Sequence, residues 1–269
     1  MITLDVWDLL ISGGLVVALA GVSVYSQLSV GRDLIVASLR MAIQLALISL
    51  MLKVLFEQRD FIWILLMSIV MVIVAGREVV ARQERPLAGW AVWGIGTSSL
   101  FVSSLTVASF ALVVLVQPQP WFHPQYAIPL LGMLLGNTMN AVALSMDRLT
   151  SGVWSHREVI EQRLMLGEDM RQATGDLIRA SVRGGLIPII NAMAVAGLVS
   201  LPGMMTGQIL SGVAPTVAVK YQILIWFLIA AGSGFGMLIA VHLTCRQLFD
   251  DRQRLMLSRL RTNQDLESR

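Results

Sequence analysis

The feature that most constrains this chain is a set of long apolar stretches, the longest of which, residues 86–146, contains no Asp, Glu, Lys or Arg. Across all 269 residues, 56% of the side chains are hydrophobic and only 14% are charged. A helix needs about 20 apolar residues to cross the hydrocarbon core of a bilayer, and several stretches here reach that length. Their apolar residues do not alternate with polar ones, which favours helices over a membrane β-barrel. The sequence therefore predicts an all-α integral membrane protein.

Charged residues and turn signals divide the chain into about seven spans. The proline-rich stretch QPQPWFHPQ (117–125) predicts a hairpin turn within the longest uncharged run. The uncharged run 184–219 is too long for one span, and its Pro and Gly residues predict a break with a short helix at the membrane boundary. We expect a single transmembrane permease domain over residues 1–269. Its spans are expected at 9–31, 34–52, 61–80, 88–116, 127–146, the first part of 184–219, and 221–245.

The distribution of basic residues predicts the orientation of these spans, because cytoplasmic loops are enriched in Lys and Arg. With the N-terminus outside, 17 of the 20 Lys and Arg residues lie on the cytoplasmic side. We therefore expect a cytoplasmic loop at 148–183 and a cytoplasmic C-terminus. The basic tail at 246–269 is expected to extend as a helix that contacts membrane lipids or a partner protein. This arginine excess at the inner face accounts for the net charge of +3 without a nucleic-acid partner.

The cytoplasmic loop leads into the most charged stretch of the chain, EQRLMLGEDMRQATGDLIRASVRGGLIP (161–188). Ser155 and Glu158 have the spacing of a capping box at the start of a first helix. After Gly167, apolar residues three and four apart predict a second helix, with acidic residues at its N-terminal end. The segment is expected to form a helix, a glycine turn, and a second helix that continues into the sixth span.

A cytoplasmic helix-turn-helix joined directly to a span has the form of a coupling helix, the part of an ABC permease that sits in a groove of the ATPase. Rigid continuity with the span would let closure of the ATPase move the transport pathway. The alternative is an amphipathic loop that lies at the lipid headgroups. The residues expected to couple to an ATPase are Glu161, Leu164, Leu166, Gly167, Asp169, Met170 and Arg179.

The chain has no G-x-x-x-x-G-K-[ST] motif with which to bind ATP. ATP and Mg are therefore expected on a separate cytoplasmic ATPase subunit, with no cofactor on this chain. Glycine and proline residues in the second half of the chain predict hinges in its helices. The hinge candidates are Gly184, Gly185, Pro188, Pro202 and Gly203.

Polar side chains are costly inside a membrane, so those within the spans indicate either a substrate pathway or helix pairing. Asn137 and Asn140 lie three residues apart on one face of the fifth span. They could equally bond across a close helix contact made by Gly132 and Gly136, and methionines often fill irregular cores. No metal site is assigned, because His, Cys, Asp and Glu form no cluster with metal-ligand spacing. The candidates for the pathway are Met133, Asn137, Asn140, Asp147, Met204 and Met205.

Three stretches occur in the order GMLLGNTMNAVALSMDRL (132–149), the charged segment 161–188, and GLVSLPGMMTGQILSGVAPTVAVKYQI (197–223). Together they resemble the FetB family of ABC transporter permeases, which includes bacterial iron-export permeases and plant permeases of aluminium tolerance. The resemblance implies a homodimeric subunit of the inner (plasma) membrane that works with a separate ATPase and exports a metal ion such as iron. Plant relatives have been linked to a nucleotide sugar, so the resemblance also allows a non-metal substrate.

Two other classes of function are compatible with a multi-span chain. A secondary transporter or channel would work without an ATPase, but only Arg40 and Asp147 are candidates for a charged relay within the spans. A membrane scaffold or sensor would carry a large soluble domain, which this sequence does not predict. No nucleophile, base and orienting group come together, so the chain is not expected to be an enzyme.

Overall fold

The computed structural model describes residues 5–28, 30–58 and 60–260, and within these residues the chain is helical, with isolated β-bridges and no strand. Seven helical segments there are long and apolar enough to cross a membrane. They are Val6–Tyr25, Gly31–Lys53, Phe61–Ala81, Val92–Val116, Pro124–Ser155, Met170–Val195 and Pro215–Gln247. The predicted all-α class with about seven spans is confirmed.

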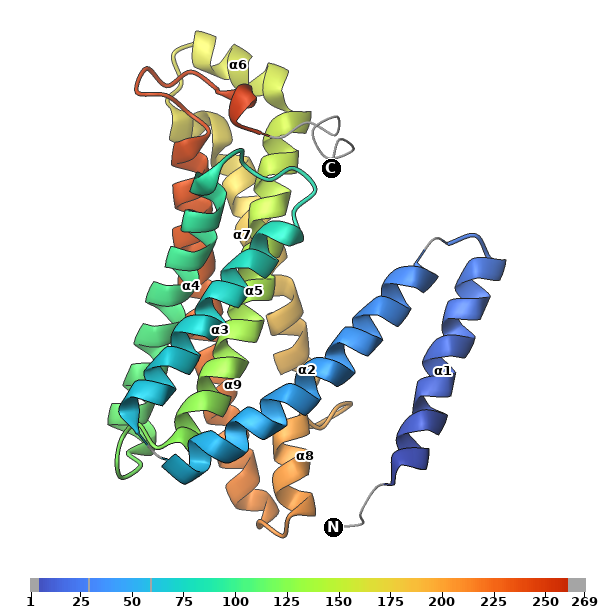
Figure 1. The fold of residues 1–269 in the computed structure, drawn as a ribbon. Coiled ribbons are helices and arrows are strands. Elements are labelled where there is room, and N and C mark those ends of the chain that lie inside the picture. Colours follow the sequence, from blue (N-terminus) through green and yellow to red (C-terminus); the bar gives the residue numbers. More distant parts are fainter. Residues whose placement is uncertain (1–4, 29, 59, 261–269) are drawn as a thin grey trace. The chain divides into compact units, whose positions relative to one another are not determined.

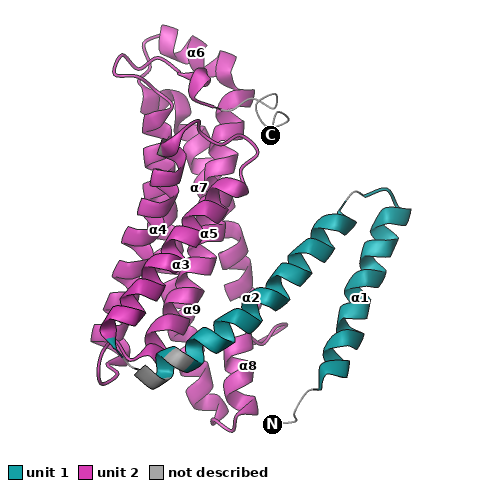
Figure 2. Cartoon of the chain, viewed as in Figure 1, with its two compact units in different colours: residues 1–60 teal, residues 61–269 magenta. Residues whose placement is uncertain are grey.

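The chain forms two compact units, residues 1–60 and 61–269 (Figure 2). Unit 1 is a pair of helices, α1 (Val6–Tyr25) and α2 (Gly31–Gln58). The side chain of Asp5 caps α1, and the two helices meet where a Cβ on Gly31 would lie 2.9 Å from the Ala20 carbonyl oxygen. Unit 1 is thus a tight hairpin, and the single-domain interpretation of residues 1–269 stays a prediction.

Unit 2 contains the remaining described elements (Figure 1). In chain order they are α3 (Phe61–Ala81), α4 (Trp90–Phe110), the π-helical segment η1 (Ala111–Val116), α5 (Pro124–Ser155), α6 (Arg157–Met165), α7 (Met170–Val195), α8 (Gly203–Leu210), α9 (Pro215–Gln247) and the 3-10 turn η2 (Leu257–Arg259). We call the end of unit 2 that carries α6 the α6 end, and the end that carries α8 the α8 end.

Helix α5 occupies the centre of unit 2, where it contacts α3, α4, α7 and α9. Glycines let the surrounding helices approach closely, as is common between membrane helices. A Cβ on Gly76 of α3 would lie 2.1 Å from Thr97 Oγ1 of α4, and one on Gly236 of α9 would lie 2.6 Å from Ser103 Oγ. Any side chain at these positions would force the helices apart.

The glycines on α5 that were expected to make a close helix contact do not do so. A Cβ on Gly136 would have no neighbour within 4 Å, and one on Gly132 would meet only the end of the flexible Met71 side chain, at 3.4 Å. Close packing comes instead from glycines on the helices around α5, such as Gly185 of α7. Sequence spacing alone does not show which glycines face a neighbouring helix.

The boundaries of the helices agree with the main predicted breaks. Residues 117–123 form a turn between η1 and α5, and residues 196–202 separate α7 from the short helix α8, as expected. Helix α7 runs without interruption from Met170 to Val195, so the predicted continuation of the second helix into the sixth span is confirmed. At the α8 end, the ring of Phe61 lies 5.9 Å from that of Trp121 and 5.3 Å from that of Phe122, an aromatic cluster typical of a membrane interface.

Candidate functional site

The candidate site at the α6 end is built on the turn between α6 and α7. Gly167 has a φ of +93°, a conformation that L side chains rarely adopt, and nothing lies within 4 Å of where its Cβ would be. The N–H groups of Gly167 and Glu168 donate to the carbonyls of Leu164 and Arg163, each at 3.1 Å, and so close the end of α6. The predicted helix, glycine turn and helix is confirmed, and the glycine is required by its backbone angle.

Helix α7 begins with a capping box, which lies in a different place from the predicted one. Asp169 Oδ1 accepts from the Gln172 N–H at 2.7 Å, and Gln172 Oε1 accepts from the Asp169 N–H at 3.0 Å. The capping box predicted at Ser155 and Glu158 is wrong, because α5 continues through Ser155 and α6 follows His156 without a side-chain cap. The strong cap therefore belongs to α7, the helix that enters the membrane.

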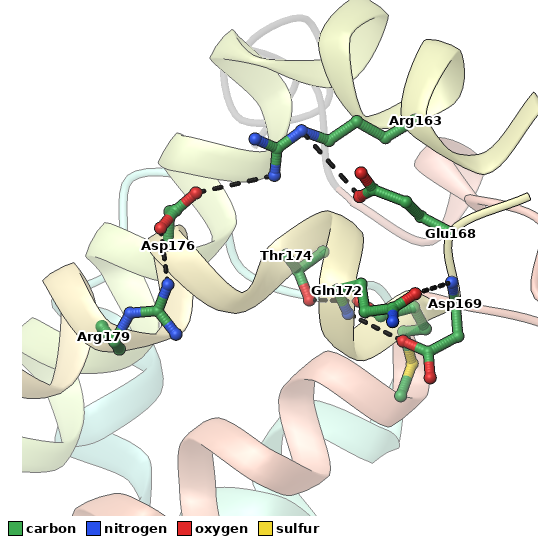
Figure 3. Close-up of polar contacts among 8 residues, drawn as sticks. Arg163, Glu168, Asp169, Gln172, Thr174, Asp176 and Arg179 are labelled. Atoms are coloured by element: carbon green, nitrogen blue, oxygen red, sulfur yellow. Dashed lines mark hydrogen bonds and ion pairs between the residues drawn. The ribbon is translucent and has the colours of Figure 1, made fainter. Parts of the chain in front are cut away.

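Ion pairs connect α6 to α7 across the turn (Figure 3). Arg163 lies 4.0 Å from Glu168 and 3.5 Å from Asp176, measured between side-chain nitrogen and oxygen atoms. Asp176 in turn lies 2.6 Å from Arg179. Exposed ion pairs are individually weak, but together these pairs orient the two helices. Arg163 and Asp176 were missed as candidates, because their pairing depends on the angle between α6 and α7.

The C-terminal segment packs against this turn. The N–H of Met170 donates to Gln253 Oε1 at 3.0 Å, which joins the start of α7 to the loop at 250–255. A groove of about 710 Å³ lies between the two segments, with Glu161, Leu164 and Gly167 on one side and residues 251–255 on the other. We call α6, the Gly167 turn, the start of α7 and the loop 250–255 the inner hairpin site.

Asp250 holds the C-terminal loop in shape. Its Oδ1 accepts from the N–H groups of Arg254 and Arg252 at 2.7 and 3.0 Å, and its Oδ2 lies 2.7 Å from the Arg254 guanidinium. The bond from the Arg254 backbone, followed by that from its side chain, lowers the pKa of Asp250 below its ordinary value. The predicted helical extension of the tail is wrong for residues 248–260, because the chain turns back there and forms only the short turn η2. Residues 261–269 lie outside the described part.

Apolar side chains are exposed at the tip of the inner hairpin site. Met165 is 78% exposed and Leu166 is 84% exposed, although charged residues surround them. Glu161 and Arg179 are also exposed, whereas Leu164 and Met170 are half-buried. Exposed apolar groups next to charges are typical of a surface that contacts a protein or a membrane.

The predicted pathway residues on α5 separate into two groups. Near the α6 end, the Asn140 amide oxygen accepts from Arg82, and Asp147 Oδ1 accepts from the Glu84 N–H at 2.8 Å. Both residues therefore bind the connection between α3 and α4. Asn137 is bonded within its own helix, since its amide donates to the Met133 carbonyl at 2.8 Å. Among the described contacts, neither asparagine bonds to a neighbouring helix, because Arg82 lies beyond the end of α3 and Asn137 bonds within α5.

Met133 and Met204 lie together at the α8 end, where both line a cavity of about 640 Å³ between η1, α5, α8 and α9. Met205 is buried and does not line this cavity. Both Met204 and Met205 lie in the regular helix α8, which follows the break at 196–202. The structure therefore brings two of the six pathway candidates to one cavity.

The hinge candidates lie in contrasting surroundings. Gly184, Gly185 and Pro188 are inside the continuous helix α7, and a Cβ on Gly184 would lie 2.0 Å from the Arg148 guanidinium of α5. The structure gives these two glycines a role in packing. Pro202 caps the N-terminus of α8, which begins at Gly203.

Within the described residues, no group of three or more His, Cys, Asp and Glu side chains could hold a metal ion.

Comparisons with known proteins extend over nearly the whole chain. The family described as "Uncharacterised protein family (UPF0014)" matches residues 6–249. A UPF0014 membrane protein of Synechocystis is 38% identical over 96% of this chain and 98% of its own length. The "Probable iron export permease protein FetB" of Escherichia coli is 33% identical over 92% of this chain and 93% of its own length.

A plant relative shows the same similarity. The protein "ALUMINUM SENSITIVE 3" of Arabidopsis thaliana is 33% identical over 87% of this chain and 84% of its own length. No solved structure matches the chain. Because the family match covers most of the chain and the relatives align along most of their own lengths, the chain belongs to the UPF0014 family of membrane proteins, as its resemblance to the FetB permeases predicted.

Proposed function

We propose that this chain is the membrane subunit of an ABC transporter that exports metal ions such as iron, energised by a separate cytoplasmic ATPase. The observation that carries the proposal is the inner hairpin site, in which exposed Met165 and Leu166 stand at a turn that leads directly into a membrane helix. The ATPase binds these two side chains in a groove, and the charged residues around them fix its orientation. The α6 end then faces the cytoplasm.

Helix α7 transmits the movement of the ATPase to the membrane. Its 26 residues correspond to a rod of about 39 Å at about 1.5 Å per residue. The capping box stabilises the end of this rod next to the ATPase, and Gly184 and Gly185 press its middle against α5. A displacement at Gly167 therefore moves α7 against the central helix rather than unwinding a flexible linker.

The proposed assembly is a homodimer of this chain with two ATPase subunits in the inner (plasma) membrane, surrounded by lipid. ATP and Mg bind to the ATPase, and this chain acts as a permease rather than an enzyme. Export of iron is supported by the name of the E. coli relative, which aligns over 93% of its length. Asp147, the acidic candidate for a proton relay in a secondary transporter, is bonded to the Glu84 N–H, which supports a structural role for this carboxylate.

The proposal is tested by purifying the tagged chain from its own host in mild detergent and identifying bound proteins by mass spectrometry. We expect a soluble partner with a Walker A motif in stoichiometric amount, and we expect Leu166→Asp to lose it. Leu198→Asp is the matched control, because Leu198 is 88% exposed but lies in the connection between α7 and α8. The proposal would be contradicted if Leu166→Asp still copurified with the partner, or if the folded chain never copurified with an ATPase. Either result would favour a hairpin that lies on the lipid surface.

A further inference from the structure

The cavity at the α8 end is lined mainly by apolar side chains. Of the described residues that line it, none carries a formal charge. Its volume of about 640 Å³ is within the range of cavities that bind small molecules. The cavity lies entirely within unit 2.

A few uncharged polar groups also line this cavity. Tyr126 of α5 and Tyr221 of α9 lie in the wall, and so does Gln208 of α8. The side-chain oxygen of Gln208 is buried and accepts no hydrogen bond from the described residues. An unsatisfied buried amide oxygen costs about 1–3 kcal/mol, so a donor on a bound molecule would be favoured there. Apolar walls with a few polar groups are typical of a ligand site.

The wall also contains the π-helical part of the chain. Leu112 and Val116 line the cavity from η1, which continues α4 with wider turns before the chain turns at Gln117. Short π-helical segments frequently occur at functional sites, because they displace side chains from the positions of a regular helix. The irregular segment and the unsatisfied amide thus occur at the same cavity.

We propose that this cavity binds an uncharged, largely apolar molecule that donates a hydrogen bond to Gln208. A bare ferrous ion is a poor occupant, because it favours imidazole and carboxylate ligands and the lining residues include neither. A nucleotide sugar is also a poor occupant, because its phosphates need cationic side chains or backbone N–H groups, and none of the described lining residues is charged. The site binds this molecule whether or not an ATPase couples to the α6 end, so it goes beyond the proposed function.

The test uses the full chain in lipid nanodiscs and 3-azioctanol, an uncharged photoreactive alcohol with one hydroxyl donor. Labelled residues are mapped by mass spectrometry. We expect saturable labelling of cavity residues that excess octanol displaces. Displacement by dioctanoylglycerol as well would identify a lipid as the natural occupant, and displacement by octanol alone would identify a small free molecule. Both results support the proposal.

Two variants separate the cavity from the general lipid surface. Val217→Trp fills the cavity from α9 and is expected to abolish the saturable labelling, whereas Ile223→Trp, on the same helix but outside the lining, leaves it unchanged. Gln208→Leu is expected to weaken binding about three- to ten-fold. Labelling that spreads evenly over exposed apolar residues, or that Val217→Trp does not reduce, would overturn the proposal.

Discussion

The two ends of unit 2 differ in how they satisfy polar groups, although the same long helices connect them. At the α6 end, charged side chains pair with one another, as in Arg163 with Asp176 and Arg254 with Asp250. At the α8 end, a cavity has no charged residue among its described lining residues and keeps an unpartnered amide oxygen at Gln208. The first end suits a charged, hydrated protein partner, and the second suits an uncharged ligand. The same helix bundle therefore has a charged surface at one end and an uncharged cavity at the other. Helices α7 and α9 connect these two ends.

The largest effect on stability is expected from a substitution that separates α7 from the central helix α5. A Cβ on Gly185 would lie 2.0 Å from Ser145 Oγ and 2.9 Å from the Ala141 carbonyl oxygen, so Gly185→Val cannot be accommodated without moving α7 from α5. We expect a loss of about 3 kcal/mol or more of stability and a lower unfolding temperature in detergent, because the overpacking is severe. Gly136→Val is the control, because no atom lies within 4 Å of its Cβ. Equal stability of the two variants would show that the two ends are not rigidly joined.

A smaller effect on stability is expected at the glycine turns, one of which lies at each end of unit 2. Gly167 and Gly197 both have positive φ values, +93° and +82°, and neither Cβ would meet an atom within 4 Å. Valine at either position adds about 1–3 kcal/mol of local strain, so the two variants should lose similar stability. Only Gly167→Val is expected to abolish substrate-stimulated ATP hydrolysis by the assembled complex, because Gly167 lies in the inner hairpin site. If Gly167→Val and Gly197→Val lost ATP hydrolysis equally, the α6 end would have no special role in coupling.

The smallest effect is a pH dependence expected at the α6 end alone. The pKa of Asp250 is lowered by bonds from Arg254, so the carboxylate stabilises the loop above the ordinary value of about 3.9 and loses this effect as pH falls through the lowered pKa. We expect the Arg254 amide, after correction for intrinsic rates, to stay protected from hydrogen exchange at pH 5 and to lose protection only below pH about 3.9.

Two controls sharpen the pH comparison. Asp250→Asn removes the titrating group and should make the exchange of the loop independent of pH in this range. Labelling of the α8-end cavity should also stay constant, because none of its described lining residues is an acid. Loss of loop protection already at pH 5 to 6 would show that another group controls the loop.

Much of the α6 end could be predicted from sequence because its signals are local. The turn at Gly167 and the acidic start of α7 depend on residues within one or two helical turns, where spacing determines geometry. The capping box was assigned to the wrong helix because Ser155 is the last residue of α5, and only the packing of α5 decides where that helix ends. The folded-back loop at 250–255 was missed for the same reason, since the bond between Met170 and Gln253 joins residues far apart in sequence.

The α8 end was harder to predict because its cavity is made by four separate segments. Met133 and Met204 were proposed individually, and nothing in their spacing indicates that they share a wall. No sequence signal distinguishes Gln208 from other polar residues, and the π-helical turns of η1 have no sequence signal in an apolar run. The close glycines also depend on the rotation of each helix about its axis, which a hydrophobic sequence does not specify.

Composition and periodicity by themselves determined that this protein is a bundle of about seven membrane-length helices with a charged hairpin before the sixth span. They could do so because insertion into a bilayer and formation of a helix depend on stretches of about 20 neighbouring residues. Only the tertiary structure decided which polar residues meet, which glycines bear the helix contacts, and where a cavity remains. These outcomes depend on how helices rotate and pack against one another, and in lipid that packing is set by shape and hydrogen bonds between residues distant in the chain.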